Sequence, residues 1–253
     1  MSFYNLSKAE RLGVVETINN EIREDVGRGE TARVLRYFSD EDTYIRKSGY
    51  LAIGKLYKEN KAGQPAVIAL LNNLLTEGDF KVRQTVINSA GEIGKSDFLV
   101  VEYFFDTGLF DENPAVRNAV IGSIKKMGEK NPAPVLQWAR KYLHHEDKEI
   151  RREICHGIEL RGRTHPEDIL PLLKELQFDK TARVRNTLVH VLGQIAYKKD
   201  CLASVIAALN TWDNKEVVEK ALDEIVDVHQ RYKDFAILSQ QEAVDYIAAH
   251  YQK

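Results

Sequence analysis

Two pairs of polar residues in this sequence share one spacing. Counted along the chain, His156 stands as far from His190 as Arg152 stands from Asn186. Imidazole binds metals and serves as an acid or base near neutral pH, and guanidinium binds phosphate and carboxylate groups. If the fold brings equivalent positions together, a metal site at the histidines and an anion site at Arg152 are the two chemistries to consider.

The sequence offers little further support for a metal or a cofactor. No third ligand of settled geometry stands beside the two histidines. The adjacent His144 and His145 point about 100° apart on a helix, so that they cannot share one ion. Cys155 falls in an apolar column and is expected to be a small buried side chain. Because Gly-rich phosphate loops, Cys-x-x-Cys pairs and Gly-x-Ser-x-Gly elbows are also missing from the sequence, we expect neither a metal nor a cofactor.

A repeated arginine accounts for the shared spacing. An aliphatic residue followed by arginine recurs at Ile45-Arg46, Val82-Arg83, Val116-Arg117, Ile150-Arg151 and Val184-Arg185. The first interval is slightly longer than the other three, which are equal, and one further step of the same size reaches Val218-Glu219. A constant interval within the range of roughly 20–50 residues is typical of a solenoid, in which each unit buries its apolar face against its neighbours.

The residues after each arginine have the spacing of an α-helix. Apolar side chains follow three, seven and ten positions later, as at Val86, Ala90 and Ile93, and form one stripe along a helix. A second set of apolar helices is predicted over residues 65–76, 97–105, 134–144, 166–176 and 201–212. Each unit is therefore predicted to be a hairpin of two helices, and the fold class is all-α.

The start of the second helix in each unit resembles the HEAT repeat. Residues 79–83, Asp-Phe-Lys-Val-Arg, and residues 90–94, Ala-Gly-Glu-Ile-Gly, are especially similar to it. The resemblance implies a right-handed α-solenoid of about six HEAT-like hairpins, with the second helices on the concave face. We expect one domain over residues 1–253, with an N-terminal cap at 1–29, repeats at 30–230 and a C-terminal cap at 231–253.

The resemblance also assigns a role to the repeated arginines. In HEAT repeats this arginine commonly pairs with an aspartate of a neighbouring repeat. Asp42, Asp79 and Asp147 each stand four residues before a repeated arginine, so we predict them as its partners and as helix caps. The arginines are then expected to hold the repeats together and not to bind a ligand.

The second helix of each repeat is expected to expose one polar face. Its residues stand one, five, eight or nine, and twelve positions after the repeated arginine. In the fourth and fifth repeats these positions align the two histidines, and also align Arg152 with Asn186. The binding surface that we predict consists of Arg152, His156, Glu159, Arg163, Asn186 and His190. Nearby, Arg161 replaces an apolar stripe residue, and we expect it to reach solvent or to pair with Glu159 or Glu153.

Composition and charge narrow the choice of partners. The chain has 36 basic and 38 acidic residues, but residues 112–200 alone carry a net charge of +5. This central segment suits phosphate or an acidic partner, although it is less basic than a dedicated nucleic-acid binder. The longest uncharged stretch, residues 62–76, is too short to span a membrane, and residues 1–8 do not resemble a signal peptide. Two cysteines are too few for a disulfide framework, so we expect the protein in the reducing cytoplasm. We also expect a monomer without membrane contact.

Two main functions remain open from the sequence. The first is a binding scaffold whose concave face holds a protein or duplex DNA. The second function is suggested by residues 147–152, Asp-Lys-Glu-Ile-Arg-Arg, and by residues 165–173. Both segments resemble helices of the bacterial HEAT-like alkylpurine DNA glycosylases. A third possibility is assembly through the apolar segment of residues 98–105, but we expect this segment to pack as ordinary core.

That second resemblance implies DNA alkylation repair with DNA bound on the concave face. Arg152 would contact phosphate, and Glu159 would be the catalytic carboxylate beside a developing oxocarbenium ion. The tryptophan–aspartate pair of that family has no counterpart here, because Trp138 and Trp212 fall on the outer helices. Whether the chain is an enzyme therefore stays open.

Overall fold

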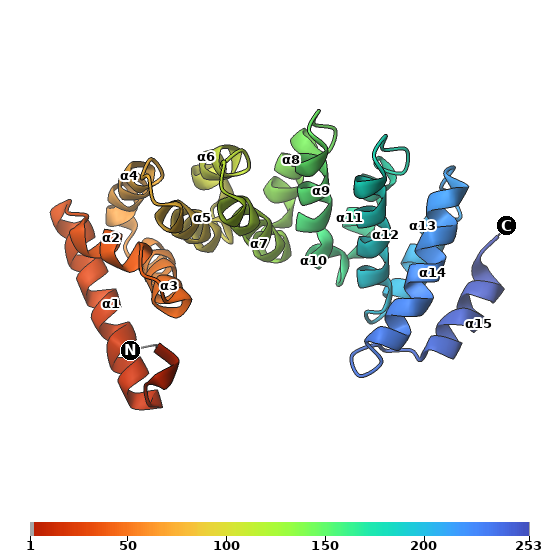
Figure 1. Cartoon of the computed structure of the whole chain (residues 1–253), viewed down its shortest axis with the longest axis horizontal. Helices are drawn as coiled ribbons and strands as arrows, with labels where there is room; N and C mark the ends of the chain where they lie inside the picture. The colour runs from red at the N-terminus through yellow and green to blue at the C-terminus, as the bar shows by residue number, and fades with distance from the viewer. Residues whose placement is uncertain (1–2, 253) are drawn as a thin grey trace. The chain divides into compact units, whose positions relative to one another are not determined.

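The computed structural model describes residues 3–252, and within them it consists of helices and turns without a β-strand (Figure 1). The all-α prediction is therefore confirmed. No helix in this described part is long and apolar enough to cross a membrane. The chain divides between Asn131 and Pro132 into two compact units. That both units belong to one capped HEAT-like domain stays a prediction.

The first unit begins with a long helix and continues as helical hairpins. Its helices are α1 (Lys8–Arg28), α2 (Ala32–Phe38), α3 (Thr43–Glu59), α4 (Gln64–Leu74), α5 (Phe80–Gly94), α6 (Phe98–Gly108) and α7 (Pro114–Lys130). Helix α5 packs against α3 and α7, the equivalent helices of the neighbouring hairpins. These three are the helices that the repeated arginine predicts.

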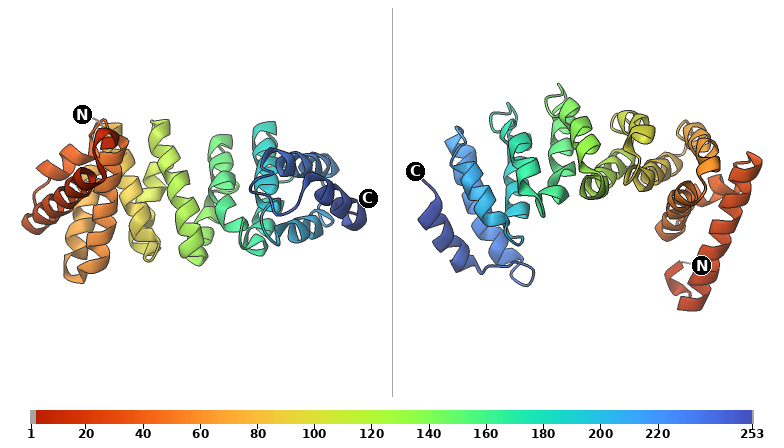
Figure 2. Two further views of the ribbon diagram at one scale, coloured as in Figure 1. Left: turned by 90° about the horizontal axis from the view of Figure 1, so that it is seen from below. Right: turned by 180° about the vertical axis from the view of Figure 1, so that it is seen from behind.

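The second unit repeats the hairpin arrangement. Its helices are α8 (Pro132–Tyr142), α9 (Lys148–Gly157), α10 (Glu159–Gly162), α11 (Pro166–Lys174), α12 (Ala182–Ala196), α13 (Cys201–Leu209), α14 (Lys215–Arg231) and α15 (Gln240–His250). Helix α12 packs between α9 and α14, and α15 closes this unit against α13 and α14. Two further views show that successive helices of each unit lie side by side (Figure 2).

The repeat spacing is visible in how the second helices begin. Asp79 accepts a hydrogen bond from the backbone N–H of Lys81, at 2.8 Å, and Asp147 accepts one from Glu149, also at 2.8 Å. Each carboxylate satisfies a helix N–H that has no partner within the helix. The predicted capping by the aspartates, including Asp42 of α3, is confirmed.

Each unit buries the apolar stripes that the spacing predicts. In the first unit the fully buried side chains include Ile53, Val86, Ile93 and Phe105, and in the second unit they include Trp138, Ile154, Leu188 and Trp212. Each fully buried aliphatic side chain contributes roughly 1.5–3 kcal/mol to stability. The stacking of hairpins therefore rests on apolar contact between neighbouring repeats.

Glycine allows two pairs of second helices to approach closely. A Cβ atom at Gly91 of α5 would lie 2.5 Å from Ser123 Oγ of α7. A Cβ atom at Gly193 of α12 would lie 2.7 Å from Cγ of Glu224 on α14. In both places the residue without a side chain sets the distance between helices.

The repeated arginines join loops and repeats, but their predicted partners are wrong. Arg83 Nε donates to Oδ2 of Asp111 at 2.7 Å, and Arg151 Nε donates to Oδ2 of Asp179 at 2.5 Å. Each aspartate belongs to the following repeat and precedes its helix cap by two residues. The aspartates at the caps are already used by backbone N–H groups, which is why the sequence spacing pointed to the wrong carboxylate.

The same arginines also bind carbonyl groups of their own loops. Arg151 Nη1 donates to the carbonyl oxygens of His145 and Glu146, at 2.7 and 2.9 Å. Equivalent bonds to the residues six and five positions earlier occur at Arg46, Arg83 and Arg117. This pattern supports the structural role that the sequence predicts for these residues.

Candidate functional site

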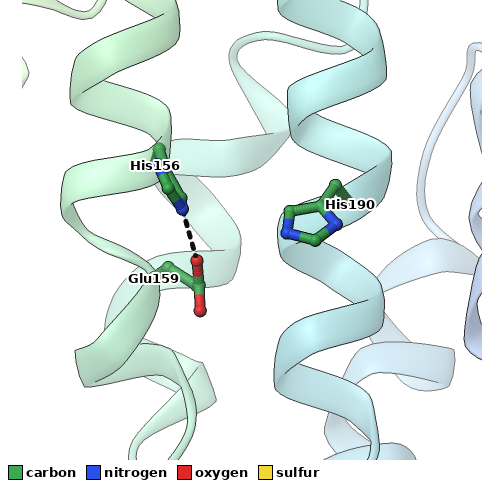
Figure 3. A group of neighbouring side chains, drawn as sticks. All are labelled: His156, Glu159 and His190. Atoms are coloured by element: carbon green, nitrogen blue, oxygen red, sulfur yellow. Dashed lines mark ion pairs between the residues drawn. The ribbon is translucent and has the colours of Figure 1, made fainter. Parts of the chain in front are cut away.

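The two histidines that share the repeat spacing lie next to each other in the second unit. His156 is on α9 and His190 is on α12, and their ring centroids are 6.2 Å apart with the planes at 66° (Figure 3). Because α9 and α12 start at equivalent repeat positions, a separation of one repeat places their side chains side by side. The predicted alignment is confirmed.

A depression of about 500 Å³ lies over these two helices. Its lining consists of Arg152, His156, Arg183, Asn186, Thr187 and His190. Four of the six predicted surface residues therefore line one depression. Arg183 and Thr187 were missed, although Arg183, Asn186, Thr187 and His190 share one face of α12 by their spacing of three, four and seven residues.

One carboxylate connects the two arginines of the depression. Glu149 Oε2 accepts a hydrogen bond from Arg152 Nε at 2.9 Å, and its Oε1 lies 3.1 Å from Nε of Arg183. Arg152 also lies 3.5 Å from Glu153 Oε1. These contacts hold two guanidinium groups, from α9 and from α12, at the same edge of the depression.

Glu159 lies beneath this surface and not on it. The residue is 1% exposed, whereas its sequence position predicted an exposed side chain. Glu159 stands eight residues after Arg151, and the glycines at the same repeat position, Gly91 in α5 and Gly193 in α12, are buried too, so the sequence pattern had grouped a buried position with the exposed face. The carboxylate points to the histidine side of the depression, with Oε2 at 3.1 Å from Nε2 of His156.

The other carboxylate oxygen of Glu159, Oε1, contacts Arg163. This oxygen accepts a hydrogen bond from Nη2 of Arg163, and the same Nη2 donates to Oε1 of Gln194 at 2.8 Å. The Arg163 guanidinium also lies 5.9 Å from the ring centroid of Tyr197, within cation–π range. Arg163, which is half-buried, therefore fixes the Glu159 carboxylate from one side.

Two buried polar atoms next to Glu159 are unsatisfied. Within the part of the chain that the structure describes, Nε of Arg163 and Nε2 of Gln194 are buried without a hydrogen-bond partner. Gln194 itself is 4% exposed. Unsatisfied buried donors are uncommon, so this pair distinguishes the Glu159 cluster from the hydrogen-bonded polar groups of the repeated loops.

His190 is oriented by the next repeat. Its Nδ1 lies 3.5 Å from Oε1 of Glu224 on α14. The close approach at Gly193 brings that glutamate to α12. With Nδ1 directed at Glu224, the second ring nitrogen of His190 faces the side of Glu159 (Figure 3).

The neighbouring Cys155 takes no part in this surface. It is fully buried in the apolar core, as predicted, and burial raises the pKa of its thiol. A buried thiol with a raised pKa is a poor nucleophile and a poor metal ligand at neutral pH. The chemistry of the site therefore depends on imidazole, guanidinium and carboxylate groups.

The partner predicted for Arg161 is wrong. Its Nε and Nη2 contact Oδ2 of Asp168, at 2.8 and 2.7 Å, in the first turn of α11. The side chain is 14% exposed. Because Glu159 is held by Arg163, Arg161 turns to the next helix, and it joins α10 to α11 instead of supplying a ligand contact.

Neither tryptophan lies on the candidate surface. Trp138 on α8 and Trp212 after α13 are both 1% exposed. Tyr50, the clearest aromatic residue of the second helices, lies in the first unit with Lys126 Nζ 5.7 Å from its ring centroid. The tryptophan of the glycosylase family's tryptophan–aspartate pair therefore has no counterpart on this surface.

Comparison with known proteins bears on the fold. No family profile and no curated protein matches the sequence. Among solved structures, AlkD2 from Streptococcus mutans aligns with a TM-score of 0.56 and 18% identity, over 76% of this chain and 95% of that one. The smu.31 protein of Streptococcus mutans UA159 aligns with the same TM-score and 19% identity, over 76% and 96%.

A third similar structure comes from a different kind of protein. The TOG domain array protein Crescerin, described as regulating microtubules in the primary cilium, aligns with a TM-score of 0.50 and 20% identity, over 77% of this chain and 88% of that one. At these identities the similarity shows the fold. The fold is that of the HEAT-like α-solenoids, and the prediction from the arginine repeat is confirmed.

Proposed function

We propose that this HEAT-like chain is a binding scaffold whose α9–α12 surface holds an anionic partner, either an acidic protein segment or duplex DNA. The residues proposed to make contact are Arg152, His156, Arg163, Asn186 and His190 from the sequence, with Arg183 and Thr187 added by the structure. Glu159 is assigned to hold His156 and Arg163 from beneath. We propose that the chain acts as a monomer in the cytoplasm.

The observation that carries this proposal is the composition of the depression. Two arginines and two histidines line a space of about 500 Å³ without a carboxylate in its lining. Glu149 contacts both arginines and orients them, and five guanidinium N–H groups on each arginine leave donors for a ligand. Fixed guanidinium groups at one edge are suited to phosphate or carboxylate oxygens.

Charge reversal of Arg152 tests the proposal directly. Arg152→Glu is expected to weaken binding to a 20-base-pair duplex, or to an acidic peptide, at least tenfold, since a buried charged contact contributes about 1.4 kcal/mol or more. The matched control is Arg140→Glu, because Arg140 is an exposed arginine of α8 that pairs with Glu175. Equal binding by the two variants would contradict the proposed surface.

A salt series separates the two partner classes. For duplex DNA, the logarithm of the affinity falls linearly with the logarithm of the salt concentration, by about 0.9 for each phosphate contact. Arg152→Glu should then reduce this slope by about one. Absence of binding to intact and abasic duplexes at low salt would remove DNA as the partner and leave the acidic peptide.

A second candidate function is DNA alkylation repair. The structural similarity to AlkD2 over most of both chains favours it, together with the resemblance of residues 147–152 to the alkylpurine DNA glycosylases. On this proposal a methylated purine is released from DNA near Glu159. The Glu159 carboxylate lies 3.1 Å from Nε2 of His156, and His156 lines the depression, so a single side chain separates the carboxylate from it.

Base release from methylated duplex DNA tests the second function. Glu159→Gln should abolish release of a methylated purine while the helical circular dichroism spectrum is kept. Glu146→Gln, in the exposed loop before α9, should release the base at the wild-type rate. If the wild-type chain binds DNA but releases no base, the scaffold function stands and the repair function is wrong.

A further inference from the structure

Ligand-type atoms of two histidines and one glutamate meet at the floor of the α9–α12 depression. One side-chain atom each from His156, Glu159 and His190 lies within 4.8 Å of the others. The three residues come from α9, α10 and α12. The sequence supplied the two histidines without a third ligand, and Glu159, three residues after His156, is the residue that the structure adds to them.

The geometry points to a binding site for one divalent first-row transition metal ion, of the zinc class, at His156, Glu159 and His190. Two imidazoles and a carboxylate are a known zinc ligand set, and they leave a fourth position open. This site shares His156 and His190 with the proposed contact surface, but all three ligands are side chains of one chain, so ion binding does not require the partner.

The distances are close to those of a bound ion. Ligand atoms about 2.0–2.1 Å from a tetrahedral zinc ion lie about 3.3 Å from one another. His156 Nε2 and Glu159 Oε2 are already 3.1 Å apart. His190 has a 44% exposed side chain, and a rotation of this side chain on α12 would close the remaining gap, which is at most about 1.5 Å from the 4.8 Å limit to the 3.3 Å of a bound ion.

Surrounding groups hold two of the ligands in the required orientation. Arg163 contacts Oε1 of Glu159, and Oε2 is the oxygen that faces His156. Glu224 lies 3.5 Å from Nδ1 of His190, which leaves Nε2 for the ion (Figure 3). A carboxylate behind a metal-binding histidine is the usual arrangement in zinc sites, because it fixes the tautomer and the ring direction.

The charge around the site is balanced. The guanidinium group of Arg152, which lines the same depression, is already paired with Glu149 and Glu153. Arg163 is neutralised in part by Glu159 itself. The Glu224 carboxylate lies 3.5 Å from Nδ1 of His190 through Oε1 and 3.5 Å from Nη2 of Arg231 through Oε2, so it is paired as well.

Titration of the full-length chain with Zn²⁺ and Co²⁺ tests this site. We expect one ion per chain by calorimetry, a visible Co²⁺ absorption band of a four-coordinate site, and a higher melting temperature with Zn²⁺. His190→Gln and Glu159→Gln should each lower the affinity at least 100-fold, and Glu224→Gln about tenfold. Because His190 is partly exposed, its variant keeps the test valid even if Glu159→Gln does not fold.

The matched control is His165→Gln, an exposed histidine before α11 that lies outside the group. It should bind both ions with wild-type affinity. The proposal is overturned if the wild-type chain binds no ion at a 1:1 ratio, or if His190→Gln binds as tightly as the wild type. A chain that binds Zn²⁺ but no DNA or acidic peptide would support this site and contradict the proposed function.

Discussion

Helices α5, in the first unit, and α9, in the second, begin with the same local pattern. Each has an aspartate cap, followed four residues later by an arginine that binds its own loop and an aspartate of the following repeat. The pair Arg151–Asp179 is more buried, with both side chains 5% exposed, than the pair Arg83–Asp111, at 12% and 11%.

The two helices then diverge. Helix α5 continues to Gly94, and its Glu92 is 14% exposed and pairs with Lys95. Helix α9 stops at Gly157, and the following Glu159 is buried between His156 and Arg163. The repeated positions therefore stabilise the stack in both units, while the position that departs from the repeat creates the candidate site in one of them.

The largest loss of stability is expected when the buried ion pair Arg151–Asp179 of the second unit is broken. Arg151→Ala should lower the free energy of unfolding by roughly 3–5 kcal/mol, because Asp179 would be left as a buried charge without its partner. Arg83→Ala should cost less, about 2–3 kcal/mol, since its pair is more exposed. Urea denaturation of both variants measures the difference, and a greater loss in Arg83→Ala would reverse the comparison.

The buried carboxylate of the second unit should matter more than the less buried Glu92 of α5. Glu159→Gln is expected to cost about 1–3 kcal/mol, because it weakens charge-assisted contacts with Arg163 and His156. Glu92→Gln should cost less, about 1 kcal/mol, because its partner Lys95 is 33% exposed and solvent weakens the ion pair. Thermal and urea unfolding of the two variants provide the test, and equal losses would show that the deeper burial of Glu159 has no energetic consequence.

The aspartates of the two arginine pairs should make stability depend on pH. Burial opposes ionisation of Asp179, but hydrogen bonds from Arg151 and Thr181 outweigh it and lower the pKa of its carboxyl. Such a carboxyl stabilises the fold above its unfolded pKa, about 3.9, and this contribution is lost as the pH falls through the lower, folded pKa.

We therefore expect the stability difference between the wild type and Asp179→Asn to be full above about pH 4 and to shrink below it. The pKa of Asp111 is lowered in the same way, against burial, by Arg83 and by the backbone of Asn113. Asp111→Asn should therefore follow the same course. Urea unfolding at stepped pH values measures both, and a difference independent of pH would contradict this origin.

The smallest loss of stability is expected when a helix cap is removed, and it should be the same in the two units. Asp79→Ala and Asp147→Ala each remove a helix cap with a hydrogen bond of 2.8 Å, and each should cost about 1 kcal/mol. Differential scanning calorimetry should show similar shifts for the two variants. A much larger loss for Asp147→Ala would mean that the cap is coupled to the neighbouring arginine cluster of the second unit.

Most of the fold could be predicted because its determinants are local. Helical spacing of apolar residues, caps at fixed offsets and a constant interval between the repeated arginines depend on position along the chain alone. The alignment of His156 with His190 follows from the same interval. These features required no knowledge of which distant side chains meet.

The segment of residues 98–105 shows the limit of such reasoning. It was expected to pack as ordinary core, and Phe98, Val101, Phe104 and Phe105 are buried. Leu99 and Tyr103, however, are 73% and 62% exposed. Helical spacing identifies which residues share a face, but only the packed neighbours show how much of each side chain they cover.

The sequence alone established the helical hairpins, their caps and the two aligned histidines, since each depends on short-range spacing or on an exact repeat. The folded chain decided which carboxylates those residues meet: Asp179 for Arg151, Asp168 for Arg161, and Glu159 for His156. The physical reason is that partner choice depends on how loops turn and on how closely neighbouring helices pack. Glu159 stands at the repeat position that is buried as Gly91 in α5 and as Gly193 in α12, so a carboxylate predicted on the surface is buried beside His156.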